Sequence, residues 1–174
     1  AVLSSGGVTQ AASEPAPAAV RSATLKLREA NPEKPWDAVA LKMMLAIESV
    51  SADFDPGAAE VEIWIGGQRC VAAAPGDGAR WSRVRHRPWK WRAKMDGTPG
   101  CAGKATLIID LHSGKLTLNH RKTDARPIQL GGASKVPVRV LLGDQEFRAL
   151  IDFHMFAKRW THRDPGARPP RDVP

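Results

Sequence analysis

Alternation of hydrophobic and polar residues is the dominant local pattern in this chain. It recurs in five runs: Val39–Ile47, Val61–Ile65, Leu107–Leu111, Val136–Leu142 and Phe147–Met155. Successive side chains of a strand point to opposite faces, so alternation places one set in a core and the other in water. Turn sequences of the kind that closes hairpins lie between the runs, at Gly66-Gly67, His112-Ser113-Gly114 and Gly143-Asp144. The pattern therefore predicts half-buried strands joined by tight turns.

The number and spacing of these runs predict the fold class. Eight or nine short strands with regular turns and no helical crossover segment are typical of an all-β domain. We expect an antiparallel β-sandwich, Ig-like or Greek-key, with a closed barrel as the alternative. Only Val39–Ser49 is ambiguous, because its Ala, Leu and Met residues also favour a helix, and there the alternation favours a strand.

The two ends of the chain differ in composition from its middle. Ala1–Ser22 consists mostly of Ala, Ser, Gly, Pro and Val, and Arg163–Pro174 alternates Arg with Asp and Pro. Segments with so few large apolar side chains cannot bury a core of their own. We therefore expect a flexible or extended arm over residues 1–22, a β-sandwich domain over residues 23–160, and a Pro/Arg-rich tail over residues 161–174.

One hairpin sequence occurs twice. Val61–Gln68 and Val138–Gln145 share the pattern V-x-[IV]-x-[IL]-G-[GD]-Q, which either a duplication or convergence on good hairpin chemistry explains. Together with Phe54-Asp55-Pro56, a Trp/Lys-rich strand pair and a Gly-Lys hairpin, the order resembles β-sandwich modules that recur in secreted and surface proteins of bacteria. The resemblance covers roughly residues 23–156. It implies a non-catalytic, extracytoplasmic module and carries over no functional residue.

Charge is distributed unevenly along the chain. Residues 1–78 contain 6 Lys and Arg against 10 Asp and Glu, whereas residues 79–174 contain 20 against 8, and the net charge is +8. A strongly basic half indicates an acidic protein or polyanionic partner. A solvated surface that keeps the protein soluble is the simpler alternative.

The segment Arg80–Lys94 concentrates this charge and contains three tryptophans but no acidic residue. Its candidate contacts to an anionic partner are Arg83, Arg85, Arg87, Lys90, Arg92 and Lys94. Such a stretch suits nucleic acid, anionic polysaccharide or lipid headgroups. Alternation places Trp89 and Trp91 on the face of Ala93 and Met95, opposite the cations. We therefore predict that these tryptophans belong to the core and leave a cationic surface without a stacking platform.

Trp64 breaks the alternation of its own strand, because it lies on the outer face with Glu60 and Glu62. An outward Trp is typical of a contact with protein. We expect it to bind either a partner subunit or the N-terminal arm of this chain.

Two Asp-x-His pairs are candidate metal ligands. In each pair, Asp110 with His112 and Asp152 with His154, the two residues would share a face of a strand. If the two strands paired, four ligands could converge in a zinc-like site. Exposed Asp on an alternating strand is ordinary, so the sequence predicts no metal and no cofactor.

The two cysteines, Cys70 and Cys101, are predicted to form a disulfide. Their even number and the Gly-rich loop around Cys101 favour a bond that would stabilise the fold by ~3–4 kcal/mol in an oxidising compartment. Two free thiols in a cytoplasmic protein are the alternative. No nucleophile elbow, phosphate-binding loop or HExxH motif is present, which argues against an enzyme.

These observations predict a non-enzymatic accessory module. We expect a subunit of a larger cell-envelope or extracellular assembly, periplasmic, cell-surface or secreted, whose basic face meets an acidic partner. The expected partners are protein subunits, and an acidic polymer or an anionic membrane surface is a further candidate. The alternatives are a binding module for an anionic polymer and a metal-dependent hydrolase. No apolar run reaches the ~20 residues of a membrane-spanning helix.

Overall fold

The computed structural model describes residues 14–26, 37–51, 53–76, 80–99, 101–123, 125, 135–156 and 159–163. Within these ranges the chain is all-β, as predicted, and its one helical element is a 3-10 turn, η1 (Ile47–Ser49). The strands are β1 (Ala16–Lys26), β2 (Asp37–Leu45), β3 (Val61–Ile65), β4 (Gln68–Ala73), β5 (Arg80–Val84), β6 (Arg87–Asp96), β7 (Lys104–Asp110), β8 (Lys115–Thr123), β9 (Lys135–Leu142), β10 (Gln145–Asp152), β11 (His154–Phe156) and β12 (Arg159–Arg163). In the described part of the chain, no helix has the length and apolar character needed to cross a membrane.

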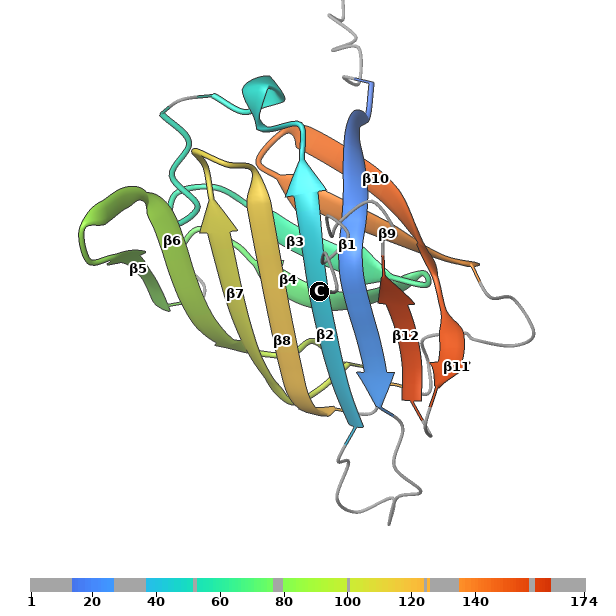
Figure 1. The fold of residues 1–174 in the computed structure, drawn as a ribbon. Helices are drawn as coiled ribbons and strands as arrows, with labels where there is room; N and C mark the ends of the chain where they lie inside the picture. The colour runs from blue at the N-terminus through green and yellow to red at the C-terminus, as the bar shows by residue number, and fades with distance from the viewer. Residues whose placement is uncertain are drawn as a thin grey trace, which may run out of the picture.

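The strands form one strongly curled sheet, a half-barrel, rather than two clearly separate sheets. Its order is β4-β3-β9-β10-β1-β2-β8-β7-β6-β5, with β12 beside the second half of β1 and β11 beside β12. In Figure 1, β6, β7, β8, β2 and β1 lie side by side toward the viewer, and β3 and β4 pass behind them. Neighbouring strands are antiparallel, except that the start of β1 runs parallel to β10. The structure thus has more strands than the eight or nine expected.

The core lies on the inner side of the curled sheet. Leu41, Leu118 and Leu107 lie next to one another on β2, β8 and β7, and all three are completely buried. The opposite wall contributes Phe147 and Val140, which are paired across β10 and β9 and equally buried. Burial of each large aliphatic or aromatic side chain contributes ~1.5–3 kcal/mol. The strand expected over Val39–Ser49 is confirmed for its first part, which belongs to β2. Its last residues form η1.

The folded region extends beyond the limits expected from composition. β1 begins at Ala16, inside the stretch expected to be an arm, and β12 continues to Arg163, inside the expected tail. Small side chains suit β1 because it is hydrogen-bonded between β10 and β2, and its Val20 and Leu25 are buried. An Ala-rich composition therefore concealed a strand. Residues 1–13 and 164–174 lie outside the described residues.

Candidate functional site

A group of cations covers the outer side of β6, β7, β8, β2 and the end of β1, which is the side turned to the viewer in Figure 1. Because Ala93 and Met95 point into the core, their neighbours Arg92 and Lys94 point outward. Strand register brings further outward cations into the same surface, such as Lys104 beside Arg121. This surface, which we call the cationic face, comprises Lys26, Lys42, Lys90, Arg92, Lys94, Lys104, Lys115 and Arg121.

Two acidic residues share the cationic face, and both have partners nearby. Asp96 forms an ion pair with Lys104, and both side chains are largely exposed. The Asp110 carboxylate accepts hydrogen bonds from the backbone N–H groups of His112 and Ser113, each at 3.1 Å, and so closes the β7–β8 turn. Of the described cations on this face, only Lys104 has an ion pair. The face therefore carries a net positive charge that is open to solvent.

The six basic residues singled out from the sequence fall into three groups. Lys90, Arg92 and Lys94 belong to the cationic face, as their alternation indicated. Arg83 instead lies over the ring of Trp91 on the other side of the hairpin, with its Cζ 4.8 Å from the ring centroid. Arg85 and Arg87 are exposed in the turn between β5 and β6 and at the start of β6. Other outward cations also alternate with buried residues along their strands, namely Lys26, Lys42, Lys104 and Arg121. Only the strand order shows that these cations belong to the same surface.

The prediction that Trp89 and Trp91 belong to the core is wrong. Trp89 is 42% exposed and Trp91 is half-buried, whereas Ala93 and Met95 of the same face are buried as expected. The start of β6 lies at the open end of the curled sheet, beside the β7–β8 turn, where Leu111 N–H donates to the Trp89 carbonyl at 3.0 Å. A side chain that points to the inner side of the sheet at that end, such as Trp89, therefore lines a cleft and does not enter the core.

This cleft, which we call the aromatic cleft, has an empty volume of about 980 Å³, part of it open solvent. Its lining includes Arg83, Trp89, Trp91 and His112, and also Asp53, Phe54 and Asp55 from the segment after η1. The rings of Trp89 and His112 have centroids 5.5 Å apart and planes inclined at 47°. The cleft thus combines an exposed indole with a guanidinium, an imidazole and two carboxylates.

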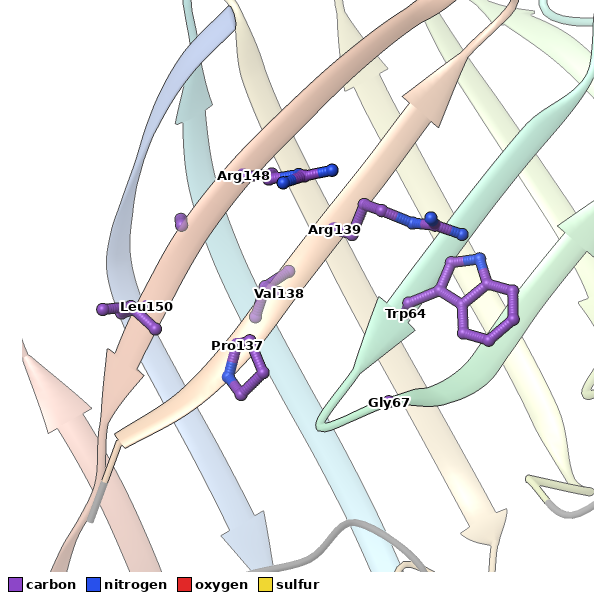
Figure 2. Close-up of a pocket in the computed structure, with 8 residues that line it drawn as sticks. Trp64, Gly67, Pro137, Val138, Arg139, Arg148 and Leu150 are labelled. Carbon is purple, nitrogen blue, oxygen red and sulfur yellow. The ribbon is translucent and has the colours of Figure 1, made fainter. Parts of the chain in front are cut away.

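A second hollow lies on the outer side of β3, β9 and β10, on the other half of the sheet (Figure 2). Its lining is largely apolar and includes Trp64, Pro137, Val138, Ala149 and Leu150, with Arg139 and Arg148 at its side. Leu150 is 59% exposed. We call this feature the apolar groove.

Trp64 points outward, as the sequence indicated, and its neighbours fix its position. Its indole N–H donates to Glu62 Oε2 at 2.7 Å, and Glu62 Oε1 forms an ion pair with Arg69 at 3.1 Å. The guanidinium carbons of Arg69 and Arg139 lie 5.8 and 4.7 Å from its ring centroid. Cation–π contacts of this kind hold the ring in place and leave it half-buried. Its role in binding a partner stays a prediction.

The four candidate metal ligands do not converge. Asp110 and His112 lie at the β7–β8 turn, whereas Asp152 and His154 belong to β10 and β11, which are not neighbours of β7 or β8 in the sheet. Asp152 Oδ2 is 3.7 Å from His154 Nε2, and His112 contacts Trp89 instead. In the described ranges, no group of three or more His, Cys, Asp or Glu is arranged to hold a metal. The hypothesis of a four-ligand site is wrong because the two strands do not pair.

The predicted disulfide is also absent. Cys70 on β4 and Cys101 in the loop after β6 are free thiols, and both are completely buried. Cys70 Sγ lies 3.6 Å from the Gln68 carbonyl oxygen, whereas Cys101 Sγ lies 3.6 Å from His120 Nδ1 and 3.7 Å from Thr123 Oγ1. Each sulfur thus has polar neighbours of its own, and the two thiols also interact with each other.

The two thiols differ in acidity. A hydrogen bond from Cys70 lowers the pKa of Cys101 to about 5; burial opposes this change, and His120 and Thr123 assist it. The same hydrogen bond, together with burial, raises the pKa of Cys70. Cys101 and His120 have the chemistry of a nucleophile and its base. Both are completely buried, so no substrate reaches them in this conformation.

No protein-family model, curated protein or solved structure matches this chain.

Proposed function

We propose that this chain is a non-enzymatic binding module that holds an anionic polymer on the cationic face. The observation that supports this proposal is the concentration of outward Lys and Arg side chains on adjacent strands, with their two acidic neighbours already engaged. Strands lie ~4.8 Å apart, so such side chains form a closely spaced array of positive charge. An array of this kind suits a partner with repeated negative charges, because each neutralised charge releases a bound counterion.

The composition of the cationic face favours a polymer over an acidic protein. Between its cations lie the polar residues Thr106, Thr117 and Asn119, together with half-buried Ile108 and Met44. The large apolar side chains that are exposed in the described residues, Trp89 and Leu150, lie elsewhere. Protein interfaces depend on buried aromatic, aliphatic or Arg anchors at their centre. A partner of the cationic face is therefore held mainly by charge.

Charge reversal tests this proposal. We expect Arg92→Glu with Lys94→Glu to weaken binding of heparin and of duplex DNA at least roughly tenfold at low salt. The double variant should also reduce the slope of log Kd against log salt concentration, by about 2 for duplex DNA if both cations meet phosphates. The matched control is Lys135→Glu with Arg148→Glu, which changes the net charge equally on exposed positions of the opposite half of the sheet. Equal losses in the two double variants, or no binding by the wild type, would contradict the proposal.

A second function, docking of a protein segment from a larger assembly, is favoured by the apolar groove. An exposed Leu150 on β10 and a fixed Trp64 on β3, with β9 between them, resemble the anchors of protein interfaces, and Arg139 and Arg148 would meet acidic flanks of an apolar segment. A photoreactive amino acid at position 150 should form an adduct with a protein subunit in the native cell. The same group at position 94 serves as the control. Equal labelling at the two positions would argue against a docking groove.

The proposal extends to fold family and location. The half-barrel encloses one continuous core between its two halves, which supports a relation to the β-sandwich modules that the sequence resembles. That resemblance supports an extracytoplasmic location, whereas the cysteines no longer do, because they are free. The absence of catalysis is supported by the burial of Cys101 and His120 and by the separation of the Asp-x-His pairs.

A further inference from the structure

We propose that the aromatic cleft binds one sugar ring of an acidic polysaccharide, and that the polymer of the proposed function is therefore a glycan containing uronic acid. The choice of an acidic polymer rests on the proposed function, whereas the sugar site rests on the cleft alone.

Trp89 provides the surface on which a ring can stack. Its indole is 42% exposed, and the His112 ring stands beside it at 47° to form a corner. The face of an indole is electron-rich and attracts the positively polarised C–H groups on one side of a pyranose. The face of Trp91 already carries the guanidinium of Arg83, so Trp89 is the stacking platform of this cleft.

The segment after η1 supplies acceptors for hydroxyl groups to the same cleft. Asp53 and Asp55 line the cleft, and the Gly57 N–H donates to Asp55 Oδ1 at 2.8 Å, which fixes the orientation of that carboxylate. Ionised carboxylates accept short, strong hydrogen bonds from hydroxyl groups. The lining as a whole is more polar than apolar, which suits a ligand rich in hydroxyl groups.

The rim of the cleft favours an acidic sugar. Arg83 lies in the cleft, and Arg85 and Arg87 follow in the adjoining turn and strand, all exposed. Guanidinium groups bind carboxylates through paired hydrogen bonds, which matches a uronate next to the stacked ring. A quaternary ammonium ligand is disfavoured because Arg83 already places a positive charge within the cleft.

Titration of the full chain with hyaluronan hexasaccharide tests the sugar site. We expect binding by calorimetry, with a change in Trp fluorescence, and a loss of roughly tenfold or more in affinity for Trp89→Ala. Trp89→Phe should keep most of the affinity, since it keeps an aromatic face. Neutral cellohexaose should bind at least about tenfold more weakly than the acidic hexasaccharide. Circular dichroism of each variant checks that the exposed substitution leaves the fold intact.

The remaining outcomes separate this inference from the proposed function. Lys135→Glu, on β9 and outside both the cleft and the cationic face, should leave hexasaccharide affinity within about threefold, whereas the double variant Arg92→Glu with Lys94→Glu tests the cationic face separately through heparin. Unchanged affinity in Trp89→Ala, equal binding of cellohexaose, or displacement by tetramethylammonium would overturn the sugar site, even if the cationic face still binds heparin. The converse result is hexasaccharide binding that depends on Trp89 together with heparin binding that Arg92→Glu with Lys94→Glu does not change. That result would support the sugar site in the cleft and contradict the proposed role of the cationic face.

Discussion

The buried thiol of Cys101 makes the stability of the fold depend on pH. The pKa of Cys101 is lowered to about 5 in the folded protein, compared with an ordinary value of 9.0. Between these two values the unfolded chain holds a proton that the folded chain has released, so stability rises with pH. The contribution is present in full above pH 9 and is lost as the pH falls through 5. Release of one proton gives an upper limit of about 1.4 kcal/mol for each pH unit within this window.

Above pH 9, Cys70 reverses the dependence of stability on pH. Its pKa is raised, so at alkaline pH the unfolded chain loses a proton that the folded chain keeps. Stability then falls as the pH rises further. The two thiols together predict a maximum of stability near pH 9.

Urea denaturation followed by Trp fluorescence at several pH values measures this dependence. We expect Cys101→Ala to unfold at lower urea at every pH, because it leaves a small cavity, and to lose most of the slope between pH 6 and pH 8. The comparison of slopes removes the contribution of other titrating groups, which both proteins share. If the wild type and Cys101→Ala have the same slope, the folded protein does not contain a stabilised thiolate and the reasoning fails.

Two further predictions concern the same region of the fold. Without a reductant, iodoacetamide should alkylate both cysteines in denaturant and neither in the native protein, and mass spectrometry that finds a bonded pair would contradict the free thiols. Gly97→Ala should destabilise the fold by about 3 kcal/mol in thermal denaturation, since its Cβ would lie 2.1 Å from the Cys101 carbonyl oxygen and 2.7 Å from His120 Nε2. Gly67→Ala is the matched control: its φ of +78° costs about 1 kcal/mol, and nothing lies within 4 Å of its Cβ. Equal losses in the two variants would show that the loop moves aside at Gly97.

The strands could be predicted from the sequence because alternation is decided locally. Each buried position of β9, such as Val138 and Val140, is flanked by residues that face solvent or are half-buried. The repeated hairpin sequence was also informative, since its two copies became β3–β4 and β9–β10. These hairpins lie next to each other, with Ile63 directly opposite Val140.

The sites could not be predicted because they depend on strand order and on the limits of the core. Alternation predicted correctly that Trp89 points to the inner side of the sheet. It could not predict that the core ends before Trp89, so that this side chain is exposed. The cationic face joins Lys42 to Arg92 across four strands, a neighbourhood that no spacing in the sequence reveals. The same applies to Cys101, whose neighbours His120 and Thr123 lie on β8, beyond β7 and the β7–β8 turn.

The position of β1 in the sheet determines the order in which the chain can fold. β1 is bonded to β2 on one side, and to β10 and then β12 on the other, so its second side stays unpaired until the last strands have been synthesised. The β3–β4 hairpin must likewise wait for β9. Closing such distant pairs is slow and leaves strand edges open in the nascent chain. An edge made largely of alanine, serine and threonine offers little apolar surface to other nascent chains, so the composition that conceals β1 in the sequence also protects the chain while its sheet is incomplete.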